Sequence, residues 1–224
     1  MGQGHEVTAL VRRAPDAQAV SANLRYATVD FSDAAAVAAA VAGHDVAINA
    51  AGYITDQQGF APLVQRIVRA ADQGLGPDGR FWMLAGAAIL DVPGTDQMAL
   101  GLPGVPRLYE AHRANLEAVR ASRLDWSVLC PGPMIDAPDG LPTQDLVVSA
   151  ESWPVGAPPL ARWLPKPVLS IAFVRALPRM TLYYEDAASV ILAHLDRGGT
   201  FSRKRVGVAL PHGLRRSKPR PSGG

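Results

Sequence analysis

The sequence predicts an α/β protein with a mainly parallel, doubly wound sheet between two helical layers, a three-layer α/β/α arrangement. Short apolar runs alternate with longer segments of helical periodicity, which is the pattern of strand–helix–strand units. The 224 residues are 48% hydrophobic and 19% charged, which suits one globular domain with a substantial core. We expect that domain over residues 1–213 and a disordered basic tail over residues 214–224.

Six apolar runs are expected to form strands and four periodic segments to form helices. The Ala-rich helix should be capped by Asp30 or Ser32 and closed by Gly43. The strands should lie at 6–11, 24–29, 45–50, 80–86, 125–130 and 205–210, and the helices at 30–43, 60–74, 108–122 and 183–196.

Between residues 137 and 180 the periodicity weakens and eight prolines accumulate. Irregular segments of this length inside a compact domain usually cover a functional site. We therefore expect a substrate-covering insertion that includes Trp153 and Trp163.

Charge and cysteine content narrow the class of protein. Residues 203–224 hold seven of the 22 basic residues and none of the 20 acidic ones, so the rest of the chain carries −5. No aromatic residues lie among the tail charges, which argues against a nucleic-acid partner. The single cysteine, Cys130, ends an apolar run and is interpreted as a packed thiol in a reducing compartment. Without a signal peptide or apolar span we expect a cytoplasmic protein with no membrane partner, and its oligomeric state stays open.

The first strand of a dinucleotide-binding fold, with its glycine-rich turn, is not found before residues 5–13, which resemble the second strand of such a fold. The G-x-G-x-x-G at residues 74–79 follows a helix and precedes a strand, the reverse of the required order, and Pro77 lacks an amide donor. It is interpreted as a helix-ending turn. Either strands 6–11 and 45–50 pair directly or an apolar gap separates them, and either a wrongly chosen start or a real truncation would explain the difference.

The motifs together resemble the atypical short-chain dehydrogenase/reductases, in particular the NAD(P)H-binding, NmrA-like and flavin- and biliverdin-reductase-like proteins. The residues that carry the resemblance are GHEVTALVRR, RYATVD, VAINAAG, LDWSVLCPGPM and YYEDAASVILAHLD, in the family's order and spacing. The resemblance covers nearly the whole chain except its start and tail. It implies a Rossmann-like fold that lacks the first strand, and a small-molecule substrate.

The resemblance also implies where a cofactor would bind. Arg12 and Arg13 follow a strand at which an acidic residue would favour NAD, so two guanidinium groups there favour the 2′-phosphate of NADP(H), with NAD(H) as the alternative. Asp30 would accept a hydrogen bond from adenine, or would merely cap the helix. The implied cofactor-binding residues are Arg12, Arg13, Asp30, Phe31, Asn49, Ala50, Ala51, Gly52, Gly86, Pro131, Gly132, Pro133 and Met134.

The catalytic set departs from the family pattern. Gly86, Ala87 and Ala88 stand where many relatives carry a catalytic Ser or Thr, so the usual proton relay is in doubt. Tyr109 and Arg113 have the i, i+4 spacing of the family's Tyr and Lys, although a guanidinium is not equivalent to an ammonium. His112 lies beside them with an ordinary pKa suited to proton transfer.

Two functions are compatible with these residues. The first is an oxidoreductase that transfers a hydride between NADP(H) and a small carbonyl, quinone or flavin-type acceptor. The second is a non-catalytic NADP(H)-binding redox sensor, and a truncated chain that no longer binds cofactor is a further alternative. No metal site is expected, and Asp186 is interpreted as a helix-capping residue.

Overall fold

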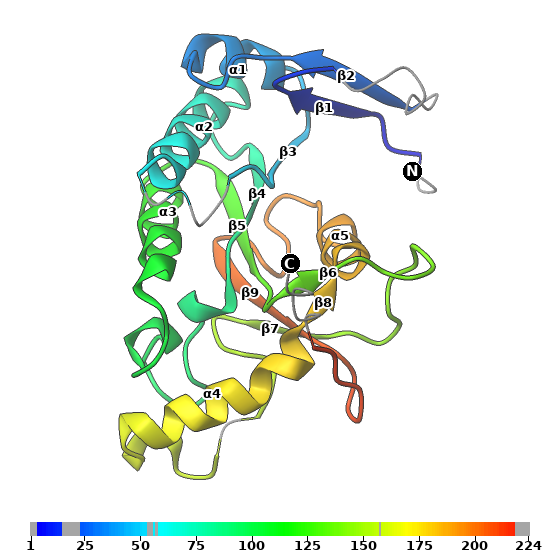
Figure 1. Ribbon diagram of the computed structural model, residues 1–224. Helices are drawn as coiled ribbons and strands as arrows, with labels where there is room; N and C mark the ends of the chain where they lie inside the picture. Colours follow the sequence, from blue (N-terminus) through cyan, green and yellow to red (C-terminus); the bar gives the residue numbers. More distant parts are fainter. Residues whose placement is uncertain (1–3, 15–22, 53–55, 57, 157, 218–224) are drawn as a thin grey trace, which may run out of the picture.

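The computed structural model describes residues 4–14, 23–52, 56, 58–156 and 158–217. Its centre is a five-stranded sheet in the order β3 (Val46–Asn49), β4 (Arg80–Leu84), β5 (Asp125–Cys130), β9 (Lys204–Ala209) and β7 (Val147–Ala150) (Figure 1). The first four strands are parallel and β7 is antiparallel to β9. The α/β prediction is therefore confirmed, with each predicted strand present.

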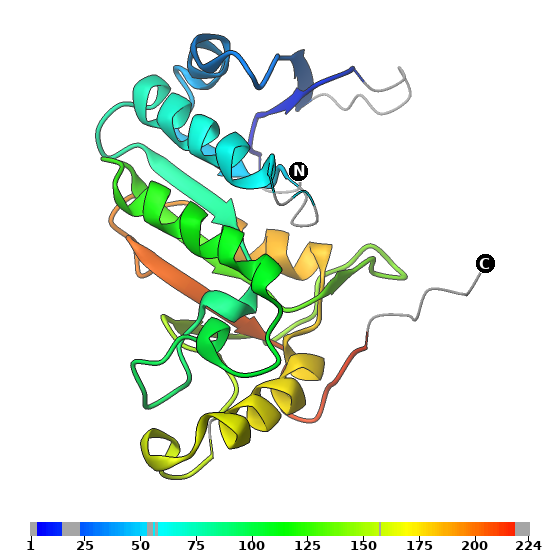
Figure 2. The same cartoon turned by 60° about the vertical axis from the view of Figure 1, so that its left-hand side comes forward.

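Helices cover both faces of this sheet. Helices α2 (Phe60–Gly74) and α3 (Glu110–Arg120) lie on one face and α5 (Tyr184–Leu192) lies on the other (Figure 2). Along β4 the alternation of side chains divides the core, since Phe81 and Met83 pack toward α2 and α3 and Trp82 packs toward α5. Nearly all of β4 and β5 is buried, as expected for central parallel strands.

The two N-terminal strands form a separate sheet. Strand β1 (Val7–Val11) pairs in parallel with β2 (Leu24–Thr28). No hydrogen-bonded pairing joins β1 to β3 in the part of the chain that is described, and Val7 and Ile48 are both more than 40% exposed. His44, just before β3, hydrogen-bonds the hydroxyl of Thr8 in β1. Of the two predicted outcomes, a gap is observed and direct pairing is not.

Helix α1 (Ala34–Val41) packs on α2 through Val37 and Ala70. The predicted cap was wrong. Asp33, and neither Asp30 nor Ser32, caps this helix by accepting from the amides of Ala35 and Ala36. The helix ends at Val41, and Gly43 adopts a φ of +77°, as the predicted glycine stop requires.

The segment 137–180 is more regular than expected. It contains β7 and the 15-residue helix α4 (Lys166–Met180), and β6 (Met134–Ile135) lies just before it. Pro167 lies in the first turn, where no intrahelical donor is needed, and Pro178 lies in the last turn. Strand β6 pairs with β8 (Leu182–Tyr183), which directly precedes α5.

The two tryptophans expected in the lid have different environments. Trp153 is buried and its ring meets that of Phe173 edge-on at 5.3 Å, so it belongs to the core. Trp163 is 72% exposed. The assignment of Trp153 to a substrate lid was therefore wrong.

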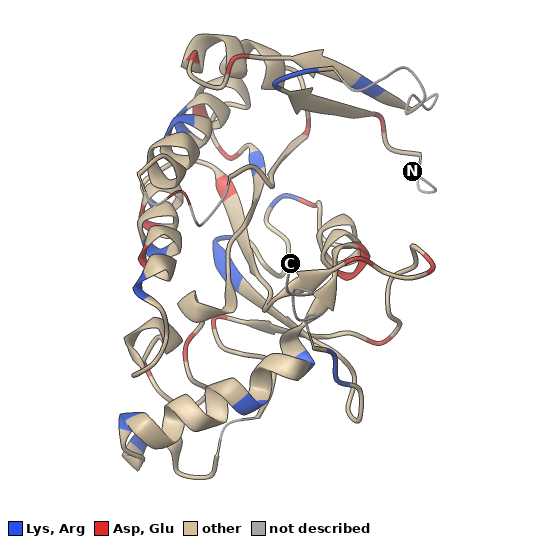
Figure 3. Ribbon diagram, in the orientation of Figure 1, with Lys and Arg blue, Asp and Glu red and all other residues tan. Residues whose placement is uncertain are grey.

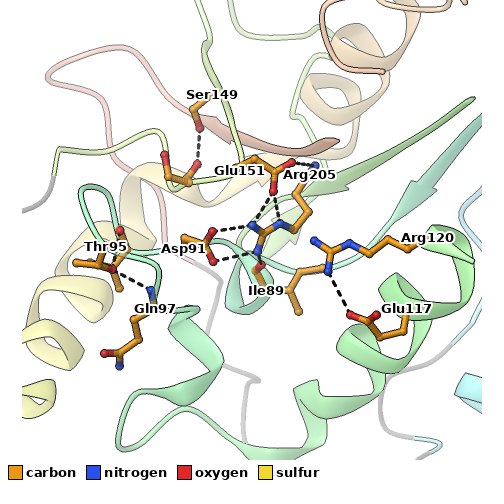
Figure 4. Close-up of polar contacts among 11 residues, drawn as sticks. Ile89, Asp91, Thr95, Gln97, Glu117, Arg120, Ser149, Glu151 and Arg205 are labelled. Atoms are coloured by element: carbon orange, nitrogen blue, oxygen red, sulfur yellow. Dashed lines mark hydrogen bonds and ion pairs between the residues drawn. The ribbon is translucent and has the colours of Figure 1, made fainter. Parts of the chain in front are cut away.

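A buried arginine connects β9 to the neighbouring loop and to β7. Arg205 donates to Asp91 at 2.6 and 3.0 Å, to Glu151 at 2.6 Å and to the carbonyl of Ile89 at 2.6 Å (Figure 4). Because the guanidinium is only 6% exposed, its charge depends on these two carboxylates.

The C-terminal segment is ordered further than residue 213. Arg216 donates to the fully buried Asp186 at 2.6 Å and to the hydroxyl of Thr143 at 2.6 Å, and it lies over the ring of Tyr183. Asp186 also accepts from the amide of Tyr183, which confirms its predicted role at the start of α5. Arg216, which was expected to lie in a disordered tail, is therefore held against α5, and residues 218–224 lie outside the described part of the chain.

Candidate functional site at the carboxyl edge of the sheet

The predicted site residues follow the carboxyl ends of the parallel strands. Asn49 ends β3, Gly86 follows β4, and Pro131 follows β5, so the three lie along one edge of the sheet (Figure 1). Ligands of open α/β sheets bind at this edge. The fold therefore brings together, at one edge of the sheet, residues that the sequence analysis took from separate motifs.

The turn after β3 is built around a glycine. Asn49 is buried and its side-chain oxygen accepts from the amide of Ala51 at 3.0 Å, while Ala50 and Ala51 are exposed. Gly52 has a φ of +119°, and the ring of Phe60 occupies the space that a Cβ there would need. Only glycine therefore gives this turn its close approach to the start of α2.

Gly86 lies next to the imidazole of His112. A Cβ at Gly86 would lie 3.1 Å from Nε2 and Cδ2 of His112, so the missing side chain leaves the space that the imidazole occupies. The ring of Tyr109 stacks on His112 at 6.1 Å, and Phe60 meets it edge-on at 5.5 Å. The position that carries a hydroxyl in many relatives is thus covered here by an imidazole.

Burial lowers the pKa of His112 from 6.5 to about 4. The side chain is 8% exposed and its Nδ1 has no hydrogen-bond partner among the described residues. The imidazole is therefore neutral near pH 7. The expectation of a pKa suited to proton transfer was wrong, because the sequence does not show that this face of α3 is buried.

Tyr109 and Arg113 are not arranged as the predicted pair. Tyr109 is half-buried at the start of α3, next to His112. Arg113 is exposed and donates to Glu110 at 2.8 Å. Among the described residues no hydrogen bond or cation–π contact joins Tyr109 to Arg113, whose guanidinium is paired with Glu110 instead.

The turn after β5 is fixed by backbone hydrogen bonds to residues 180–182. Gly132 donates its amide to the carbonyl of Met180, and a Cβ at Gly132 would meet that carbonyl at 2.7 Å. Pro133 accepts from the amide of Leu182, and Met134 begins β6. Pro131 is buried and Pro133 is exposed, so the rigid turn presents Pro133 to solvent at the edge of the sheet.

Arg12 and Arg13 line a cavity of about 480 Å³ at the carboxyl end of β1. Asp30 follows β2, the strand paired with β1, and its exposed carboxylate accepts from the amide and hydroxyl of Ser32. These two hydrogen bonds lower the pKa of Asp30, and Arg66 of α2 adds a smaller effect in the same direction. Phe31 packs into the core.

Three residues near the site were not predicted. Phe60 supports both Gly52 and His112, Arg66 acts electrostatically on Asp30, and Asn115 is buried one turn after His112 with its side-chain oxygen unpartnered among the described residues. Only Asn115 had a usable signal, because it follows His112 at the i, i+3 spacing that shares a helical face.

The residues implied by the resemblance lie in two groups. Arg12, Arg13 and the hydrogen-bond acceptor Asp30 follow β1 and β2. The glycine-containing turns follow β3, β4 and β5 at the carboxyl edge of the main sheet. Within the described residues no glycine-rich turn joins a parallel strand to a helix in the way that holds a pyrophosphate. No group of three or more metal-ligating side chains is found in that part of the chain, and none of its helices has the length and hydropathy needed to cross a bilayer.

The sequence model of a family described as NAD(P)H-binding matches residues 1–154. The chain belongs to this family. The family match therefore confirms the NAD(P)H-binding resemblance and spans Arg12, Gly52, Gly86 and the turn after β5. A search of curated proteins found no match.

Solved structures share the fold of this chain. A candidate NADH-flavin reductase from Streptococcus pneumoniae superposes with a TM-score of 0.67 at 21% identity, covering 94% of this chain and 90% of that one. A candidate epimerase from Bacteroides thetaiotaomicron gives 0.68 at 20% identity, covering 94% and 88%. A short-chain dehydrogenase/reductase of the wide type from Veillonella parvula, in complex with NADP, gives 0.61 at 16% identity, covering 96% and 86%. These likenesses confirm the Rossmann-like α/β fold.

Proposed function

We propose that the protein is an NADP(H)-dependent oxidoreductase that reduces a small quinone or flavin-type acceptor, or a small carbonyl. The observation that carries this is that two arginines, Arg12 and Arg13, line a cavity at the end of β1, in a chain of the NAD(P)H-binding family. A bound NADPH would supply the hydride from C4 of its nicotinamide.

The chain's own residues would hold the cofactor at its two ends. Arg12 and Arg13 would bind the 2′-phosphate by charge and by forked hydrogen bonds, and Asp30 would accept from the adenine amino group. Gly52, Gly86 and the turn at Pro131–Met134 would line the nicotinamide end. The NADP complex of the Veillonella protein supports this choice of cofactor by analogy of fold.

The surroundings of His112 favour acceptors that need no acid from the protein. A histidine with a pKa of about 4 is almost entirely neutral at pH 7, and Gly86, Ala87 and Ala88 carry no hydroxyl. The neutral imidazole would position or hydrogen-bond an acceptor without delivering a proton as imidazolium. Quinones and flavins take up their protons from water after hydride transfer, whereas carbonyl reduction gains more from a side-chain acid.

A steady-state assay of NADPH oxidation at 340 nm tests the proposal with a quinone, a flavin and an aldehyde. We expect turnover with the quinone or the flavin to exceed turnover with the aldehyde. NADPH binding without turnover of any acceptor would instead support the second candidate, a redox sensor, which the separation of Arg113 from Tyr109 favours. Absence of both binding and turnover would refute both functions.

A further inference from the structure

Helix α4 has one apolar face in the core and a second apolar face in solvent. Leu169, Phe173 and Ala176 are buried. Val168, Ile171 and Val174 are 42%, 54% and 63% exposed, and at 100° per residue they lie on the opposite side of the helix. Leu160 and Trp163, just before the helix, are 71% and 72% exposed. We call these five exposed side chains the α4 face.

Every charge within residues 160–180 is positive, and one carboxylate from outside this segment, that of the exposed Asp96, lines a pocket together with Arg162. Residues 160–180 contain Arg162, Lys166, Arg175 and Arg179 and no acidic residue, and Figure 3 shows α4 with basic positions only. Arg179 is partly buried and donates to the carbonyl of Leu210, while the other three cations are exposed. The guanidinium of Arg162 lies 5.1 Å from the ring centre of Trp163.

Contrary to the expectation from the sequence that the protein has no membrane partner, we propose that the α4 face docks on the surface of an anionic lipid bilayer, with Trp163 at the level of the headgroups. Interfacial helices that lie in the plane of a membrane combine exposed apolar side chains and tryptophan with flanking cations. Arg162, Lys166 and Arg175 would contact acidic headgroups while Ile171 and Val174 enter the boundary of the acyl chains. The proposal does not depend on the proposed catalytic function.

Charge complementarity selects the bilayer over a second copy of the chain. In a symmetric dimer built on this face, Arg162, Lys166 and Arg175 of one protomer would meet the same cations of its partner. Within residues 160–180 no carboxylate offsets that repulsion, and Asp96 beside Arg162 supplies only one negative charge against the three cations of each protomer. An anionic bilayer instead offers negative charge and an apolar interior together.

The position of α4 leaves the dinucleotide region free. The helix runs along the end of the molecule opposite to β1 and β2 in both views (Figures 1 and 2). The cavity lined by Arg12 and Arg13 lies at β1. A protein docked through α4 would therefore keep that cavity open to solvent.

Tryptophan fluorescence provides a direct test because Trp163 alone is exposed among the four tryptophans. Trp82, Trp126 and Trp153 are at most 5% exposed. We expect phosphatidylserine-containing vesicles to shift the emission to the blue and brominated lipids to quench it, and both effects to be lost in Trp163→Phe. Emission unaffected by such vesicles would overturn the proposal.

Co-sedimentation with vesicles separates the apolar and ionic contributions. Each cation near an anionic surface contributes about a fivefold gain in partitioning, so Arg162→Gln/Lys166→Gln/Arg175→Gln should bind about 100-fold more weakly. Ile171→Ser/Val174→Ser should weaken vesicle binding by a factor of at least about 10. The control is Leu141→Ser, which removes a comparably exposed apolar side chain from the loop between β6 and β7 and should bind like the wild type.

Two further results would contradict the proposal. The first is equal binding to phosphatidylcholine vesicles and phosphatidylserine vesicles. The second is a dimer, seen by sedimentation equilibrium without lipid, that Ile171→Ser/Val174→Ser dissociates. Circular dichroism and the unchanged emission of the three buried tryptophans would verify that each variant is folded.

Discussion

Burial of His112 makes stability depend on pH in a defined window. Its pKa is about 4 in the folded protein and 6.5 when solvated, so acid favours the unfolded chain, which binds the proton more readily. The stability that the neutral imidazole contributes is complete above pH 6.5 and is lost as the pH falls toward 4. By pH 5 the loss is about 2 kcal/mol, because the unfolded state is protonated roughly 30 times more often than not.

Urea unfolding at pH 7.5 and pH 5.0 measures this loss in the wild type and in His112→Phe. The variant should lose about 2 kcal/mol less between the two pH values, whatever it loses at both through altered packing. His5→Gln, which removes an exposed histidine, should behave like the wild type. Equal losses in the wild type and His112→Phe would refute the assignment of a buried neutral imidazole.

Three further substitutions test contacts that shape the fold and the site, each by urea unfolding. Arg205→Met should lower the free energy of unfolding by about 3–5 kcal/mol, because it leaves Asp91 and Glu151 without a counter-ion. A loss below about 1 kcal/mol would contradict the ion-pair network. Gly52→Ala should lower the free energy of unfolding by about 1–3 kcal/mol, because residue 52 has a positive φ and a Cβ there would meet the ring of Phe60. An unchanged unfolding midpoint would contradict this turn conformation. Asp186→Asn should cost about 1–3 kcal/mol near pH 7. Burial alone would raise the pKa of Asp186, but its hydrogen bonds lower the pKa below 3.8. The stability that the Asp186 carboxylate contributes should therefore be lost as the pH falls below 3.8. An equal destabilisation by Asp186→Asn in acid would contradict this role of the carboxylate.

The order of strands and helices could be predicted because each element carries a local signal. The alternation of apolar runs with periodic segments located β1, β2, β3, β4, β5 and β9, and Asp186 marked the start of α5. Helix α4 was missed because Pro167 and Pro178 suggested irregular structure, although proline is compatible with the first turn of a helix. Local signals do not show which of its apolar side chains the rest of the fold buries and which it leaves exposed.

The candidate site was predicted only in part, for a different physical reason. Motifs located Gly52, Gly86 and the turn after β5, since backbone geometry there depends on the residue itself. The roles of His112 and Arg113 depend on which side of α3 faces the sheet and on what fills the space beside Gly86. Those are tertiary facts, and the i, i+4 spacing alone did not determine them.

The central claim is that Arg12 and Arg13 select a phosphorylated dinucleotide, and a fluorescence titration with NADPH and NADH tests it most directly. The wild type should bind NADPH at least about tenfold more tightly, the value expected for charge-assisted hydrogen bonds to one phosphate. Arg12→Ala/Arg13→Ala should abolish the preference and leave NADH affinity unchanged, while Arg69→Ala, an exposed arginine of α2 outside the cavity, should retain it. Equal affinity of the wild type for both dinucleotides, or a preference that survives in the double variant, would contradict the claim.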